Sequence, residues 1–178
     1  MSVISNFEEI NLKPYSLVVL DIDDTLIYFE KINFEWWKEK FEFYYNLYKD
    51  FDLAEKQSYV VWLEEISKIR PKLTDEKIFS FFENCEKNNC KVILLTARKE
   101  IVKDITIKQL HECGLIFNKD DVYFDENKGD RIKTLIKITY NNFDNIIFVD
   151  DLESNLTDVK NSILDKNLTL YKFINHKN

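Results

Sequence analysis

Three carboxylates and a threonine fall within five positions, Asp21 to Thr25, directly after the apolar run 17–20. Carboxylates this close repel one another and are costly to bring near a core, unless a cation or a specific reaction compensates them. These residue types suit a divalent metal ion or a nucleophilic carboxylate. Asp and Thr are also ordinary turn and helix-cap residues, so this stretch alone leaves a structural role equally open.

Other apolar runs also end in polar residues: Thr96 follows 91–95, and Asp150 and Asp151 follow 145–149. Short apolar runs rich in β-branched residues are typical of buried strands. In open α/β sheets the carboxyl ends of parallel strands share one edge, and ligands bind there. We therefore expect these side chains to converge on Asp21.

Lys128 adds a positive charge to the predicted edge. It precedes Gly129 at the expected start of a helix, where the helix dipole favours a bound anion. Lys133 is the competing candidate, but it lies within the helix, one turn farther from the edge. We therefore assign the anion-binding role to Lys128.

Strand-type and helix-type patterns alternate along the chain, which predicts an α/β fold with a mostly parallel sheet and helices on both faces. The expected strands are 16–21, 91–95, 122–124, 145–149 and 168–173. The expected helices are 99–113, a helix from 128, and 156–164. Between the first two strands, aromatic residues at helical spacing predict helices over 35–51 and 53–69, and Thr74 is the expected N-cap of a third. Most of these aromatic rings are expected to pack in a core, with one or two left for a pocket.

The composition excludes several functions. A chain of 178 residues, 45% of them hydrophobic, suits one domain with a modest insert. A net charge of −7 argues against a nucleic-acid surface, and two glycines are too few for a Gly-rich phosphate loop or a dinucleotide fingerprint. Three cysteines without metal-type spacing, and no apolar leader or membrane-length segment, predict a cytoplasmic protein that does not bind membranes.

Phosphoryl transfer through an aspartyl-phosphate is the chemistry that fits these residues. A carboxylate can act as the nucleophile, and attack on a phosphate dianion requires neutralisation of the surrounding charge. Mg²⁺ is typically held by one or two carboxylates together with phosphate oxygens and water. The hydroxyl of Thr96 and the ammonium of Lys128 are both suited to phosphate oxygens.

The order of these motifs resembles the haloacid dehalogenase superfamily of phosphohydrolases: Asp21-x-Asp23-x-Thr25, strand–Thr96, Lys128, and strand–Asp150-Asp151. The resemblance implies a Rossmann-like, three-layer core with strand order 5-4-1-2-3 and a Mg²⁺-dependent phosphatase mechanism. Asp21 would be the nucleophile and Asp23 the general acid and then base, while Thr96 and Lys128 would bind the transferring phosphoryl group. The expected metal ligands are Asp21, the backbone carbonyl of Asp23, Asp151, and Asp150 through water.

Two further residues are candidates for substrate binding. Arg98, two positions after Thr96, could hold a substrate anion with its two-pronged guanidinium. A surface salt bridge at a helix start is an equally good interpretation of Arg98. Thr25, at the end of the first motif, is the second candidate.

The expected domains are a core of 1–27 and 91–178 and a helical cap of 28–90, whose last helix, about 75–88, could belong to the core instead. The substrate would be a small-molecule phosphate ester. The alternatives are a phosphotransferase or mutase of the same fold, a phospho-receiver domain, and a non-catalytic protein that binds a partner through the insert. A receiver domain is disfavoured because an acidic pair follows Lys128, and a non-catalytic protein because it would not need the acidic set. Substrate identity and oligomeric state are left open.

Overall fold

The computed structural model describes residues 1–177, and within them the central element is a six-stranded parallel sheet. Its strands, in spatial order, are β1 (Ser2–Ile4), β8 (Asn167–Phe173), β7 (Asn145–Asp150), β2 (Ser16–Leu20), β5 (Lys91–Thr96) and β6 (Val122–Phe124). Numbering the five strands that the sequence predicts in chain order gives 5-4-1-2-3, so the expected topology is confirmed. The sequence did not predict β1, which extends the sheet beside β8.

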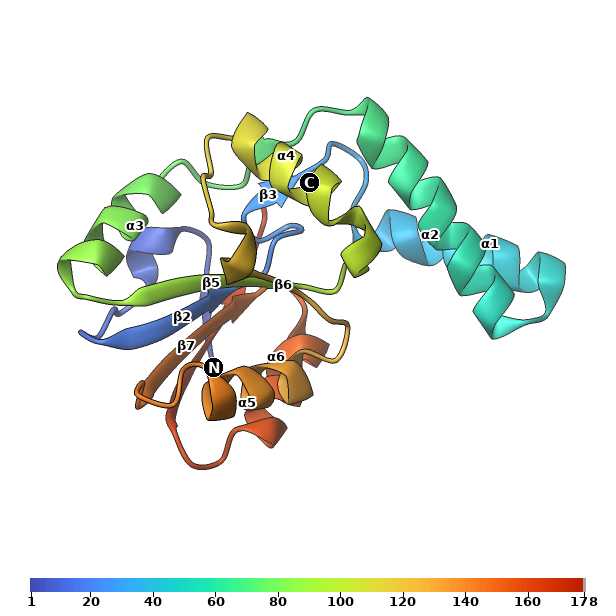
Figure 1. The fold of residues 1–178 in the computed structure, drawn as a ribbon. Helices are drawn as coiled ribbons and strands as arrows, with labels where there is room; N and C mark the ends of the chain where they lie inside the picture. Colours follow the sequence, from blue (N-terminus) through green and yellow to red (C-terminus); the bar gives the residue numbers. More distant parts are fainter. Residues whose placement is uncertain (178) are drawn as a thin grey trace.

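Helices cover both faces of this sheet, as expected (Figure 1). One face carries α3 (Ile78–Lys87) and α4 (Lys103–Glu112), and the other carries α5 (Lys128–Ile138) and α6 (Glu153–Ser162). Single 3-10 turns are η1 (Phe7–Glu9), η2 (Glu100–Val102) and η3 (Lys119–Asp121). Side chains alternate along a strand, so Val18 of β2 packs in the first core and Val19 in the second. Both faces of β2 are therefore buried.

The insert leaves the core through a short antiparallel ribbon, β3 (Ile27–Tyr28) with β4 (Lys72–Leu73). Between these strands, α1 (Phe34–Tyr48) and α2 (Phe51–Lys68) form a helical hairpin that extends beyond the sheet (Figure 1). The side chain of Asp50 accepts a hydrogen bond from the Leu53 amide and starts α2. Among the described residues, no helix combines the length and apolar character needed to cross a bilayer.

Thr74 fastens the returning end of the insert to the core. Its hydroxyl lies 2.6 Å from the carbonyl oxygen of Thr25 and donates to it, and its amide donates to the carbonyl of Leu26 at 3.1 Å. The next helix begins only at Ile78, with Lys77 at the cap position. The prediction that Thr74 is an N-cap is therefore wrong, because its hydroxyl holds the loop that follows β2.

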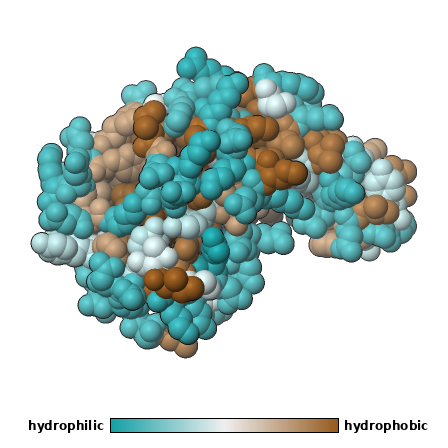
Figure 2. Space-filling model, in the orientation of Figure 1, coloured by the Kyte–Doolittle hydropathy of each residue, from teal (hydrophilic) through white to brown (hydrophobic). Residues whose placement is uncertain are grey.

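The aromatic rings of the hairpin are more exposed than the sequence suggests. Within residues 1–177, α1 contains no buried residue, and Phe43 and Phe51 are each 61% exposed. Figure 2 shows apolar residues scattered among hydrophilic ones on this hairpin. Because the hairpin projects from the sheet, α1 packs mainly against α2, for example through Phe41 and Phe51 with ring centroids 5.0 Å apart. The expectation that most of these rings are core residues is wrong for α1.

Candidate active site

The carboxyl ends of β2, β5 and β7 lie side by side and bring three polar side chains to one edge. β2 is paired with β5 on one side and with β7 on the other. Asp21 follows β2 directly, and its amide donates to the carbonyl of Val149 at 3.0 Å. Thr96 and Asp150 end the neighbouring strands, and all three side chains are buried. The convergence expected from the parallel sheet is therefore present.

Lys128 reaches this edge from the start of α5 and is only 1% exposed. Its ammonium nitrogen lies 2.5 Å from Oδ1 of Asp21 and 2.7 Å from Oδ2 of Asp150, and donates to both. Lys133, the competing candidate, is exposed on the same helix. Burial alone would lower the pKa of Lys128, but Asp150 and Asp21 outweigh burial and raise it. Lys128 therefore carries its charge between two buried carboxylates.

Gly129 lets the first turn of α5 approach α6 closely. Its amide donates to a carboxylate oxygen of Asp158 at 2.6 Å, and a Cβ at this position would lie 2.8 Å from the Asp158 carbonyl oxygen. We expect Gly129→Ala to destabilise the fold by about 1–3 kcal/mol, because the helix start must shift to relieve this overlap. Urea unfolding measures the loss, with Lys133→Ala as the exposed control on the same helix. Equal stability of the two variants would contradict the prediction.

Asp151 adds a third carboxylate to the site. One oxygen from each of Asp21, Asp150 and Asp151 can be chosen so that the three lie within 4.8 Å of one another. Burial raises the pKa of Asp151 to about 9 and, against the opposing charge of Lys128, that of Asp21 to about 7. These raised pKa values mean that three ionised carboxylates beside a single ammonium are unfavourable unless a further cation is present. Since divalent cations such as Mg²⁺ take oxygen ligands of this kind, the donor set is compatible with a divalent metal ion.

Hydrogen bonds fix the direction of Asp150. Its Oδ1 accepts from the Leu152 amide at 2.9 Å, and the side-chain amide of Asn155 donates to Oδ1 at 3.0 Å and to Oδ2 at 3.1 Å. Asn155, at the start of α6, thus orients the carboxylate that also accepts from Lys128.

Asp23 lies in the turn after β2, where the amides of Leu26 and Ile27 both donate to the carbonyl of Ile22. Arg98 donates to both of its carboxylate oxygens, from Nε to Oδ2 at 2.8 Å and from Nη2 to Oδ1 at 2.7 Å. Asp23 keeps about a third of its side-chain surface exposed, and the Arg98 side chain is 1% exposed. The structure therefore places Arg98 in a buried, two-pronged ion pair with a predicted catalytic residue, not on the surface.

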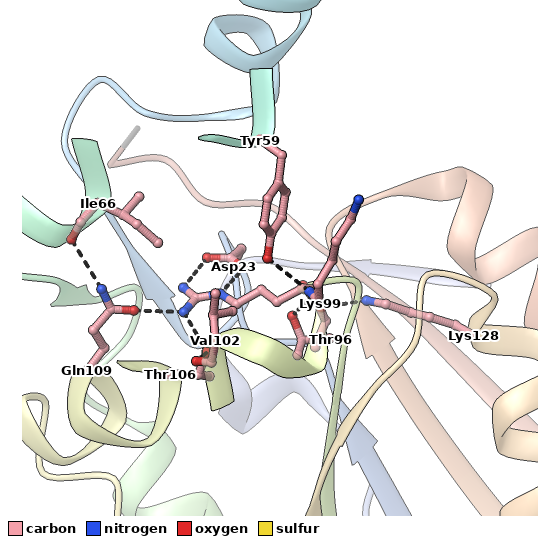
Figure 3. A network of polar contacts seen from close by, with 11 residues as sticks. Asp23, Tyr59, Ile66, Thr96, Lys99, Val102, Thr106, Gln109 and Lys128 are labelled. Atoms are coloured by element: carbon pink, nitrogen blue, oxygen red, sulfur yellow. Dashed lines mark hydrogen bonds and ion pairs between the residues drawn. The ribbon is translucent and has the colours of Figure 1, made fainter. Parts of the chain in front are cut away.

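Further contacts hold the guanidinium of Arg98. Its Nη1 donates to the Thr106 hydroxyl at 3.1 Å and to Oε1 of Gln109 at 2.7 Å, and the Gln109 amide donates to the carbonyl of Ile66 in α2 (Figure 3). Thr106 and Gln109 were not among the residues predicted from the sequence. The available signal was that both are polar residues on the apolar face of a helix, in register with Val102 and Leu110.

Thr25 lies apart from the converging residues. It is fully buried, and its hydroxyl has no hydrogen-bond partner among residues 1–177. Its carbonyl accepts the hydrogen bond from Thr74. The lining of the cavity described below does not include Thr25 within the described part of the chain. This position indicates a structural role in the loop.

A cavity of about 280 Å³ separates the strand ends from the insert. Asp21, Thr96, Lys128 and Asp151 form what we call its floor, and aromatic rings of the insert and of the preceding loop form what we call its roof: Phe29, Phe34, Trp37, Tyr59 and Trp62. Figure 3 shows Tyr59 pointing from the insert toward Lys99 and Thr96, with Lys128 entering from another side. The sequence identified the floor, whereas Tyr59 carried no distinguishing signal.

Comparisons with known proteins bear on the family and the fold. A family model described as "Protein of unknown function (DUF2608)" matches residues 2–124 and 122–177, and no curated protein matches the sequence. The class C acid phosphatase from Bacillus anthracis is similar in structure, with 16% identity and a TM-score of 0.50 over 94% of this chain and 70% of the phosphatase. A Thermotoga maritima protein assigned as a beta-phosphoglucomutase has 13% identity and a TM-score of 0.54 over 89% of this chain and 84% of that protein. These likenesses show the haloacid dehalogenase-like fold.

Proposed function

Because this chain belongs to the family described as a protein of unknown function (DUF2608), which names no activity, we propose its function from the site itself. The proposal is Mg²⁺-dependent hydrolysis of a phosphate monoester, with the phosphoryl group passing through Asp21. The buried ion pair between Asp21 and Lys128, on the floor of a cavity, is the observation that carries it. Few structural roles require an ammonium to be buried between two carboxylates at an accessible pocket.

In the first step, a carboxylate oxygen of Asp21 attacks phosphorus and the bond from phosphorus to the ester oxygen breaks. Because Arg98 pairs with the ionised form of Asp23, Asp23 must first take up a proton from solvent at its exposed edge. It passes this proton to the departing oxygen, so the alcohol leaves neutral and Asp21 carries the phosphoryl group. Lys128 and the hydroxyl of Thr96 face the same cavity and donate to the phosphoryl oxygens. Lys128 is thereby the main positive charge that the chain itself offers to the transferring group.

In the second step, water attacks phosphorus while Asp23, now a carboxylate, takes a proton from that water. The bond between phosphorus and Asp21 breaks, which releases inorganic phosphate and restores the Asp21 carboxylate. Arg98 touches both oxygens of Asp23, so it fixes the direction of the carboxylate that handles the proton in each step. In this scheme Arg98 is a positioning residue and not a ligand of the substrate.

The residues that would hold Mg²⁺ are Asp21, the backbone carbonyl of Asp23, Asp151, and Asp150 through water. When bound, the ion supplies positive charge against the phosphoryl oxygens. The surplus of carboxylates over ammonium groups at the floor supports this assignment. Two similar structures support the reaction class by their names, a phosphatase and a phosphomutase, and the phosphatase has also been solved with tungstate bound.

The test is release of inorganic phosphate from phenyl phosphate by the purified protein, with Mg²⁺ and with EDTA. We expect turnover with Mg²⁺ and none with EDTA. A panel of alkyl, sugar and aryl phosphates in Mg²⁺, Mn²⁺ and Co²⁺ completes the experiment. No release from any of them by protein with an intact melting transition would contradict the proposal. Transfer of the phosphoryl group to an added alcohol, in place of its release, would indicate the phosphotransferase alternative.

Arg98→Lys is expected to lower kcat by about 10- to 100-fold with little change in KM, because lysine keeps the charge but cannot hold both oxygens of Asp23. The matched control is Arg70→Lys, since Arg70 is exposed and donates to the Glu112 carbonyl away from the cavity. Steady-state kinetics on one substrate give both constants. A rise in KM at constant kcat would instead assign Arg98 to substrate binding.

A further inference from the structure

The floor of the cavity accounts for the phosphoryl group, but the proposed mechanism does not use the roof. The roof rings belong to the hairpin and to the loop before it, and they line the same cavity as Asp21 and Lys128. In a phosphate monoester the group attached to phosphorus must extend away from the nucleophile, and these rings form the largest apolar part of the remaining cavity wall. The side chains of the roof should therefore indicate which kind of leaving group the site accepts.

Three of the roof rings, those of Trp37, Tyr59 and Trp62, pack against one another. Trp37 lies edge-on to Trp62 and to Tyr59, with ring centroids 6.5 and 6.4 Å away, and Tyr59 and Trp62 are 5.4 Å apart. The Tyr59 hydroxyl also accepts a hydrogen bond from the Lys99 amide at 3.0 Å, and the guanidinium of Arg98 lies 5.3 Å from the Trp62 ring centre. These contacts fix the rings in the unliganded chain. Aromatic walls held in this way favour a flat ring, which can lie face-on or edge-on to them.

The other charges that line the cavity restrict the leaving group further. Outside the floor and the Arg98–Asp23 pair, the cavity is lined by three carboxylates, Asp24, Glu55 and Glu126, and by one ammonium, Lys99. The Lys99 ammonium already lies 5.0 Å from the centre of the Tyr59 ring. A leaving group with its own negative charge would meet net repulsion here. Nucleoside polyphosphates and phosphorylated carboxylic acids therefore fit poorly.

The size of the cavity sets a third limit. Ligand pockets usually measure roughly 300–1,000 Å³, so a cavity of about 280 Å³ is small. It suits a phosphoryl group and a single ring better than a dinucleotide. We propose that the substrate is the phosphate monoester of a single-ring aromatic alcohol without a second negative charge, with its ring against Trp37, Tyr59 and Trp62. This inference rests on the proposed function, because it assumes that the floor holds the phosphoryl group.

The experiment compares kcat/KM for benzyl phosphate and cyclohexylmethyl phosphate. Their alcohols are both primary and differ mainly in whether the ring is flat and aromatic. A difference in kcat/KM therefore reflects contacts with the roof more than the ease of breaking the bond to phosphorus. We expect benzyl phosphate to be favoured by about tenfold, the value of one or two aromatic contacts. 4-Carboxybenzyl phosphate should be about tenfold poorer than benzyl phosphate, because it adds a negative charge near three carboxylates.

Trp37→Leu should bring the ratio of benzyl to cyclohexylmethyl phosphate close to one. The ratio is taken within one protein preparation, so partial loss of folded protein cancels. Phe43→Leu is the matched control on the same helix, since Phe43 is 61% exposed and away from the cavity, and it should leave the ratio unchanged. A wild-type ratio near or below one, or an unchanged ratio in Trp37→Leu, would overturn the inference.

Beryllofluoride separates this inference from the function on which it rests. It mimics a phosphoryl group on a carboxylate and carries no leaving group. A Mg²⁺-dependent rise in melting temperature with beryllofluoride, lost in Asp21→Asn, together with no preference for benzyl phosphate, would overturn the aromatic substrate and leave the phosphatase intact. Absence of this rise together with absence of hydrolysis would overturn both.

Discussion

Lys128→Met is expected to destabilise the metal-free protein by about 3–5 kcal/mol. The lysine is almost fully buried, and its ammonium is the charge that Asp21 and Asp150 share. Methionine is unbranched and only one atom shorter than lysine, but it leaves two buried carboxylates facing each other without a cation. Urea unfolding in EDTA measures the loss. Lys133→Met is the control, and the replacement of this exposed lysine should change stability by less than about 0.5 kcal/mol.

The same variant tests whether the three carboxylates bind a metal ion. If the three carboxylates bind Mg²⁺, the ion supplies part of the positive charge that Lys128→Met removes, so the loss of stability should be smaller in saturating Mg²⁺ than in EDTA. Unfolding of both proteins under the two conditions gives the comparison. A loss of the same size in Mg²⁺ and EDTA would contradict a cation site formed by Asp21, Asp150 and Asp151.

Asp21→Asn is expected to lower kcat by about a thousandfold or more while the protein stays folded. Asparagine has nearly the same shape and can still accept a hydrogen bond from Lys128, but its amide oxygen is a poor nucleophile toward phosphorus. Phosphate release under saturating substrate measures kcat, and a melting curve reports the fold. Asp120→Asn, at an exposed position, serves as the matched control and should keep full activity.

A smaller loss would assign a different role to Asp21. If Asp21→Asn kept more than about a tenth of the activity, Asp21 would be a residue that orients or neutralises and not the nucleophile. In that case the attacking group would be water, and Asp23 and Asp151 would be the candidates for its base.

The residues of the floor could be predicted from the sequence because parallel strands all end at the same edge of a sheet. Once 17–20, 91–95 and 145–149 are recognised as buried parallel strands, their carboxyl ends must share an edge, which brings Asp21, Thr96 and the pair Asp150-Asp151 together. Lys128 was preferred to Lys133 because it stands at the start of the helix, where the dipole favours an anion, and Lys133 lies one turn farther from the edge.

Features that depend on contacts between distant segments could not be predicted. Arg98 and Asp23 are 75 positions apart, and no local pattern shows that one holds both oxygens of the other. Likewise β1 is only three residues long and gains its hydrogen bonds from β8 at the far end of the chain. Helical spacing of the aromatic residues in α1 identified a helix correctly, but spacing alone cannot show whether a second layer covers that face.

The most direct measurement is the mass of the peptide that contains Asp21 after acid quenching during turnover. Asp23→Asn is the useful variant, because it lacks the base for the second step, and dinitrophenyl phosphate is the useful substrate, because its leaving group needs no proton. We predict that the peptide gains the mass of one phosphoryl group at Asp21, in Mg²⁺ and not in EDTA. Release of dinitrophenol by this variant with no phosphoryl group on Asp21 at any quench time would contradict the central claim.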